Sequence, residues 1–129
     1  MATMDDAARV AMELPEVTEG ERHGHRTWYV ATKAFLWERP FSKADIKRFG
    51  EATPPEGPIL AASVDDLIEK EVVLSTSPKA LFTIPHFDGY AAVLIQLDAV
   101  TDKALGDAIV DAWLACAPPH LADEYLANQ

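Results

Sequence analysis

Hydrophobic and polar residues recur along this chain with two different periods. A helical period runs over about residues 3–13 and again over 102–116, and Pro15 and the Pro118-Pro119 pair stop these two runs. Thr3, ahead of Asp5 and Asp6, suits the start of the first helix, and Thr101-Asp102 suits the start of the last. The apolar stripe of the last helix consists of Leu105, Ala108, Ile109, Ala112, Trp113 and Cys116.

The third helical segment, "DDLIEKEVVL", follows a buried strand. "ILAASV" at 59–64 is short, apolar and free of charge, which is typical of a strand with both faces covered. Ser63 followed by Asp66 then predicts a helix start. We expect Leu67, Ile68 and Val72 to point inward from this helix.

Alternation in the remaining segments predicts strands. "TWYVATKAFLWER" at 27–39 indicates two antiparallel strands joined by a turn at 32–34. "ALFTIPHFDGYAAVLIQLD" at 80–98 indicates a hairpin with a tight turn at Asp88-Gly89. Its second strand, 90–97, is too apolar for a wet face and is predicted to be central.

Together the elements predict one α+β domain over residues 1–129. The expected architecture is two-layered: a largely antiparallel five-stranded sheet with helices packed on it, in the order α-β-β-β-α-β-β-α. Residues 40–58 interrupt this order. Ser42 and Asp45 form a capping-box pattern for one short helix there, and the length of the segment leaves open a function or a variable surface loop.

Composition narrows the function classes. The chain has 11 basic and 21 acidic residues, a net charge of −10, which disfavours binding to phosphate backbones and anionic membranes. The densest basic stretches, 22–26 and 43–48, are short and lie near acidic residues, so we predict no basic patch. One cysteine, no signal-peptide pattern and no apolar run near 20 residues predict a cytoplasmic protein without an internal disulfide or membrane span.

Four stretches resemble the MmcQ/YjbR family of small bacterial proteins: "LPEVTEGERHG", "WYVATKAFLW", "FTIPHFDGYAAVLIQLD" and "DAWLACAPPHLADEYL". In this order and spacing they span most of the chain, and residues 40–58 depart from the pattern by being longer. The resemblance implies the α-β(3)-α-β(2)-α fold, akin to secretion chaperones. It also implies a nominal DNA-binding role that rests on fold analogy, and it supplies no catalytic residues.

"GERHGHRTWYV" raises the question of a metal site. His23 and His25, two positions apart, would share one face of a strand, and a zinc site would need a further ligand from Glu21, His86, Asp88 or His120. None of these forms a recognised ligand spacing with the pair, and Gly24 favours a turn. We therefore predict no metal site, with His23-Gly24 shaping the start of a strand and His25 exposed.

"PHFDGY" is a second candidate for chemistry. His86 beside Asp88 and Tyr90 has the residue types of an acid–base group, but Pro85 and Asp88-Gly89 are explained by turn formation alone. We predict no catalytic residues, because Cys116 lies on an apolar stripe and no nucleophile elbow or glycine-rich phosphate loop is present. If a ligand pocket exists, its predicted residues are His23, Trp28, His86 and Tyr90.

These observations favour a non-enzymatic binding or adaptor domain that takes an unknown protein or small molecule and needs no cofactor. One alternative is a DNA-binding protein, which the resemblance implies and the net charge disfavours. A second is a small metal-dependent or acid–base enzyme using His23, His25 and His86. The expected assembly is a monomer or a weak homodimer.

Overall fold

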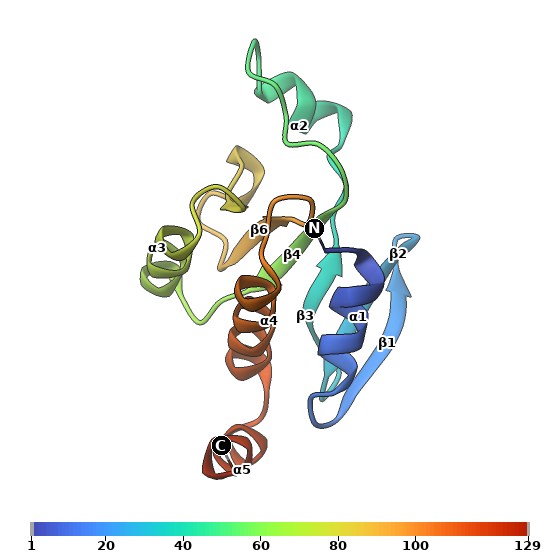
Figure 1. Cartoon of the computed structure of the whole chain (residues 1–129), viewed down its shortest axis with the longest axis vertical. Helices are drawn as coiled ribbons and strands as arrows, with labels where there is room; N and C mark the ends of the chain where they lie inside the picture. The colour runs from blue at the N-terminus through green and yellow to red at the C-terminus, as the bar shows by residue number, and fades with distance from the viewer. Residues whose placement is uncertain (1, 129) are drawn as a thin grey trace.

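The computed structural model describes residues 2–128. The elements are α1 (Met4–Met12), β1 (Val17–Arg22), β2 (His25–Val30), β3 (Lys33–Glu38), α2 (Lys43–Arg48), β4 (Ile59–Ser63), α3 (Leu67–Thr76), β5 (Leu81–Phe82), the 3-10 helix η1 (Pro85–Phe87), β6 (Ala92–Gln96), α4 (Asp102–Cys116) and α5 (Pro119–Ala127). All strand pairs are antiparallel, in the order β1-β2-β3-β4-β6-β5. Figure 1 shows α1 and α4 in front of this sheet and α2 standing beyond its upper end.

The fold class is α+β as predicted, but the sheet has six strands and not five. The missed strand is β1, in which Val17 is half-buried and the other five residues are exposed. Its polar residues give no alternation of apolar and polar positions, because an edge strand with both faces wet does not need one. The β1–β2 pairing is nonetheless complete, from Val17 opposite Val30 to Arg22 opposite His25.

Two tight turns set the register of the first three strands. His23 and Gly24, with φ of 55° and 80°, form the two-residue turn between β1 and β2, so the predicted turn is confirmed. The turn predicted at 32–34 lies instead at Ala31 and Thr32, whose φ values are 48° and 69°. The sequence did not indicate a turn at these positions, because alanine and threonine are not among the residues that favour positive φ, namely glycine, asparagine and aspartate.

The predicted starts of α1, α2 and α4 are confirmed, but the predicted start of α3 is wrong: Asp66, and not Ser63, is its N-cap, and the helix begins at Leu67. Thr3 and Asp6 form a capping box on α1, and Ser42 and Asp45 form one on α2. Thr101 caps α4 by accepting a hydrogen bond from the backbone of Ala104. No helix in residues 2–128 has the length and apolar character that crossing a bilayer requires.

The two faces of the sheet carry separate cores. The larger core lies between the sheet and helices α1 and α4, and its fully buried side chains include Trp28, Phe35, Leu60, Ile109 and Trp113. The smaller core lies on the opposite face. It consists of Trp37, Ile59, Ala61, Ile84, Phe87, Ala92 and Leu94, with Phe41, Phe49 and Phe82 packed around them.

Helix α3 presents a different face to the core from the one predicted. Leu67, Ile68 and Val72 are exposed by 49%, 79% and 51%, so their predicted inward orientation is wrong. Lys70 and Val73 point inward instead. The Lys70 ammonium donates hydrogen bonds to the backbone oxygens of Phe87 at 2.7 Å and Tyr90 at 2.9 Å, which satisfies a buried cation and fixes the helix rotation.

The second predicted hairpin has the right strands and the wrong turn. In the β5–β6 pair, Leu81 lies opposite Ile95 and Phe82 lies opposite Leu94. Residues 83–91 form a long connection that contains η1. Pro85 has no N–H to continue a ladder, and Ile84 and Phe87 turn into the smaller core. β6 lies between β4 and β5 and is almost wholly buried, so its predicted interior position is confirmed.

Candidate functional site

A groove of about 710 Å³ opens beside the smaller core, at the end of the sheet that carries the β1–β2 turn. We call it the binding groove. Its wall comes from three segments far apart in sequence: the β1–β2 turn, the stretch from the end of β3 into α2, and η1. The lining residues are Arg22, His23, His25, Thr27, Trp37, Glu38, Arg39, Pro40, Phe41, Ser42, Ala44, Arg48 and His86.

The β1–β2 turn supplies one basic side of the groove. Arg22 ends β1 directly opposite His25, and His23 occupies the positive-φ turn position between them. The Arg22 guanidinium lies 5.6 Å from the centre of the Trp37 ring, a cation–π contact. Within residues 2–128, no carboxylate oxygen lies within 4.0 Å of that guanidinium.

The segment from Arg39 to Arg48 supplies the other basic side. The buried carboxylate of Asp45 holds it together: Oδ2 lies 3.0 Å from Nη1 of Arg39, and Oδ1 lies 3.9 Å from Nη1 of Arg48. Burial alone would raise the pKa of Asp45, but hydrogen bonds from Ser42 and the charge of Arg39 outweigh it and lower this pKa below its ordinary value. One anchored carboxylate thus places two arginines at the groove.

Aromatic rings and one acid complete the wall. Trp37 lies 6.4 Å from Tyr90, and the Arg39 guanidinium lies 5.6 Å from the Phe87 ring. His25 Nδ1 lies 3.7 Å from Glu38 Oε1, and among the described residues that line the groove Glu38 alone carries a carboxylate. The groove is therefore cationic and partly aromatic, although the whole chain carries a charge of −10.

Lys70 positions the third segment. Its two hydrogen bonds to the backbone oxygens of Phe87 and Tyr90 clamp the connection that carries His86 into the groove. Burial lowers the pKa of Lys70, against the charges of Asp88 and Glu71, which raise it. The ammonium therefore acts inside the fold, on backbone oxygens, and does not line the groove.

The structure brings together part of the predicted ligand set. His23 and His86, 63 residues apart by their numbers, line the same groove. Trp28 is fully buried in the larger core on the opposite face and hydrogen-bonds Glu19, so it is not part of the groove. Tyr90 packs on Trp37 and Phe87 behind the wall without lining the groove.

The prediction that the chain has no basic patch is wrong for this groove. Stretches 22–26 and 43–48 are each short, but their ends meet once β2 and β3 pair and α2 folds against η1. Sequence reasoning also missed Trp37, Arg39 and Arg48 as groove residues. The available signal was the unusual length of 40–58 combined with its three basic residues, Lys43, Lys47 and Arg48, directly after Arg39.

The other candidate chemical groups lie elsewhere. In the described part of the chain, no three His, Cys, Asp or Glu side chains gather closely enough to hold a metal ion. His120 lines a separate hollow beside Tyr29 and Thr32. Cys116 is half-buried near the backbone oxygen of Ala34, at the far end of β3. The enzyme alternative stays a prediction.

A second groove, of about 650 Å³, lies between α3 and α4 and differs in charge. Its lining includes Lys103, Asp107 and Asp111 around apolar side chains such as Val73 and Leu81. Burial, then the charges of Glu69 and Asp107, raise the pKa of Asp111 above its ordinary value. The two hollows of comparable size are thus one cationic and one acidic.

Comparison with known proteins reveals clear relatives. Proteins of Mycobacterium bovis and of two Mycobacterium tuberculosis strains, each named as uncharacterised, are 40% identical to this chain over 130 residues, covering 99% of this chain and 98% of theirs. The chain belongs to the same family as these proteins. The family thus comprises chains of nearly the same length, without an assigned function among these relatives. No family model matches the chain, so the MmcQ/YjbR resemblance stays a prediction from motifs.

A solved structure shares the fold. A Deinococcus radiodurans protein described as containing a DUF419 domain superposes with a TM-score of 0.60 at 21% sequence identity, covering 88% of this chain and 78% of that one. At this identity the likeness establishes the architecture alone. It supports the α+β assignment and carries no activity across to the family.

Proposed function

We propose that this chain is a non-enzymatic binding domain whose binding groove holds a small anionic ligand, a carboxylate or a phosphate. The volume of about 710 Å³ falls in the range of small-molecule sites. Arginine forks match carboxylate and phosphate oxygens in two parallel hydrogen bonds, and three arginines meet here.

The observation that carries the proposal is Arg22. It lies at the groove, held over Trp37, without a carboxylate partner within 4.0 Å in residues 2–128. Arg39 and Arg48 share one carboxylate, Asp45, so the three guanidinium groups outnumber the acids that face them. An arginine without an ionic partner in a partly aromatic groove is suited to an incoming anion.

Isothermal titration calorimetry tests the proposal with three probes: inorganic phosphate, citrate and adenosine monophosphate. We expect saturable binding of at least one probe and a loss of about tenfold or more in affinity for Arg22→Ala, because a hydrogen bond to a charged group contributes about 1.5–3 kcal/mol. Arg22→Lys keeps the charge but not the fork, and should recover part of the affinity.

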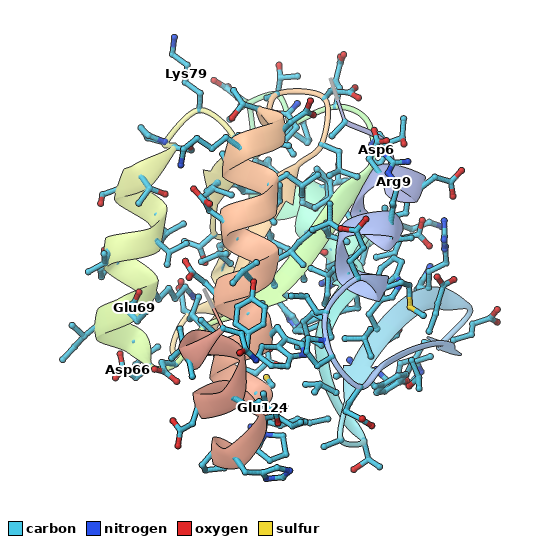
Figure 2. The ribbon with its side chains drawn as sticks, turned by 60° about the horizontal axis from the view of Figure 1, so that its bottom comes forward. Asp6, Arg9, Asp66, Glu69, Lys79 and Glu124 are labelled. Carbon is cyan, nitrogen blue, oxygen red and sulfur yellow. The ribbon has the colours of Figure 1, made fainter. Side chains whose placement is uncertain are left out.

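Arg9→Ala is the matched control. Arg9 lies on α1, over the other sheet face, and pairs with Asp6, so its removal should leave affinity unchanged. Figure 2 shows Asp6 and Arg9 together on α1. Absence of saturable binding for all three probes, or equal affinity of Arg22→Ala and the unmodified protein, would contradict the proposal. Circular dichroism of each variant establishes that it is folded.

A second candidate is binding to DNA. The observation in its favour is that Lys43 and Lys47 on α2 adjoin the groove arginines, so five of the 11 basic residues gather at this end of the molecule. The net charge of −10 opposes it. Fluorescence polarisation with a labelled duplex decides: binding that weakens steeply from about 50 to 200 mM salt supports DNA, and flat polarisation excludes it.

A further inference from the structure

Helix α3 exposes three large aliphatic side chains, two of which lie on one side of the helix. Leu67, Ile68 and Val72 are half to four-fifths exposed, because Lys70 and Val73 occupy the inward positions. Ile68 and Val72 are four residues apart and therefore lie on one side of the helix. Three large exposed aliphatic side chains on a ten-residue helix form a surface that water solvates poorly.

Acidic side chains surround these exposed aliphatic residues. Asp65 and Asp66 precede the helix, and Glu69 and Glu71 lie within it. Figure 2 shows Asp66 and Glu69 at the same end of α3. A partner for this surface must therefore offer apolar contact together with positive charge. We call residues 65–72 the acidic α3 surface.

Helix α2 of the same chain has that chemistry. Ile46 is 51% exposed, and Lys43 and Lys47 lie three and one positions from it on the exposed side. Ala44 and Arg48 face the binding groove, and Asp45 points inward. We call Lys43, Ile46 and Lys47 the basic α2 surface. It is opposite in charge to the acidic α3 surface and also has an apolar centre.

The two surfaces cannot meet within one copy. Figure 1 shows α2 beyond the end of the sheet and α3 at its side, apart from each other. Both helices nevertheless adjoin the η1 segment: α2 packs against it, and Lys70 of α3 hydrogen-bonds Phe87 within it. A two-fold axis beside η1 would place each copy's α2 close to the other copy's α3.

We infer that two copies of this chain associate reciprocally, with the basic α2 surface of each against the acidic α3 surface of the other. A six-residue helix on a ten-residue helix covers less than the roughly 800 Å² per partner of a standard interface. Reciprocal pairing doubles the contact and closes the assembly at a dimer, where a one-way contact would leave an open chain.

Light scattering after size exclusion, run over micromolar to sub-millimolar protein, tests this pairing. We expect a concentration-dependent dimer that weakens from about 50 to 500 mM salt, because exposed charge pairs are screened. Ile68→Lys and the double variant Lys43→Glu with Lys47→Glu should each weaken the dimer by about tenfold or more. Combining the latter with Asp65→Lys, Glu69→Lys and Glu71→Lys makes the α3 surface net positive, so the charges are exchanged and the dimer should be restored.

Two substitutions at exposed positions outside both surfaces are the controls, Lys33→Glu for charge and Met12→Lys for an apolar side chain. They should leave the dimer unchanged. A monomer at every concentration, a dimer that Ile68→Lys leaves intact, or a charge exchange that fails to restore association in folded protein would overturn the inference. Because Arg22 lies outside both surfaces, failure here leaves anion binding by the groove standing.

Discussion

The two faces of the sheet make an instructive pair. On one face, α1 and α4 pack on the sheet and enclose the larger core, in which Trp28 and Trp113 are fully buried. On the other face, α2 and the η1 segment cover only part of the sheet, and Trp37 lines the binding groove together with Arg22, Arg39 and Arg48. Alternate residues of the same strands therefore lie in different environments: one side of the sheet faces a closed core, and the other faces a groove that a ligand can enter.

This difference between the two faces separates residues that folding requires from residues that it does not. The covered face is explained by apolar burial alone. The open face carries features that stability does not require, such as Arg22, which has no ionic partner among residues 2–128, and His86, whose segment Lys70 holds at the groove. Substitutions on the first should change stability most, and those on the second should change binding.

The largest effect is expected on the covered face. Trp113→Ala should lower the free energy of unfolding by about 3–5 kcal/mol, since it leaves a cavity and removes the hydrogen bond from Nε1 to the backbone oxygen of Pro15. Urea denaturation measures this loss of unfolding free energy. Tyr90→Ala, a half-exposed aromatic behind the groove, is the comparison and should cost clearly less. Equal losses would remove the contrast between the faces.

A smaller effect is expected at the carboxylate that anchors the groove wall. Asp45→Asn should cost about 1–3 kcal/mol, because the neutral amide weakens the pairing with Arg39 in a buried site. The native pKa of Asp45 is lowered, so its stabilisation is present above the ordinary value of 3.8 and is lost as pH falls through the lower native value.

Urea denaturation of both proteins from neutral to acid pH measures this difference. The gap in unfolding free energy between the unmodified protein and Asp45→Asn should be widest near neutrality and close in acid. A gap that stays constant with pH would assign the loss to the capping geometry alone, and the charge of Asp45 would then have no measurable role.

The smallest effect has the opposite sign. Asp111→Asn should raise the unfolding free energy by a few tenths of a kcal/mol at neutral pH, since partial desolvation and the nearby charges of Glu69 and Asp107 disfavour its charged carboxylate. With a raised native pKa, the destabilisation is present where Asp111 is ionised in both states and disappears below the ordinary value of 3.8. The gain should vanish there too.

Asp107→Asn is the matched control for Asp111→Asn. Asp107 pairs with Lys103 at 2.8 Å, so its replacement should bring no gain in stability. Denaturation at neutral pH compares the two. A gain for Asp107→Asn as large as that for Asp111→Asn would mean that a general reduction of negative charge, and not burial, stabilises the protein.

Sequence patterns predicted the elements that are determined by interactions between residues close together in the sequence. The α1 cap, the α4 stripe, the capping box at Ser42 and the His23-Gly24 turn each depend on residues within a few positions of one another. β1 escaped prediction because an edge strand wet on both sides needs no hydrophobic alternation. α3 was placed with the wrong side inward because Lys70 finds its partners 17 and 20 residues away.

The binding groove could not be predicted for the same reason. Arg22 and Arg48 look unremarkable in their own stretches, each near acidic residues, and they line one hollow only after two strand pairings and the folding of α2. The net charge of −10 describes the surface on average and gives no information about a local cluster of basic residues. His23 and His86 were identified from turn motifs, which lie at corners where a fold opens hollows.

The strands at the two borders of the sheet have one more consequence. β1 carries the charged residues Glu19, Glu21 and Arg22 among its six, and β5 is only two residues long. Neither offers a neighbouring chain a long neutral ladder of free backbone groups to extend. Fibril growth by strand addition is thereby discouraged at both edges of the sheet.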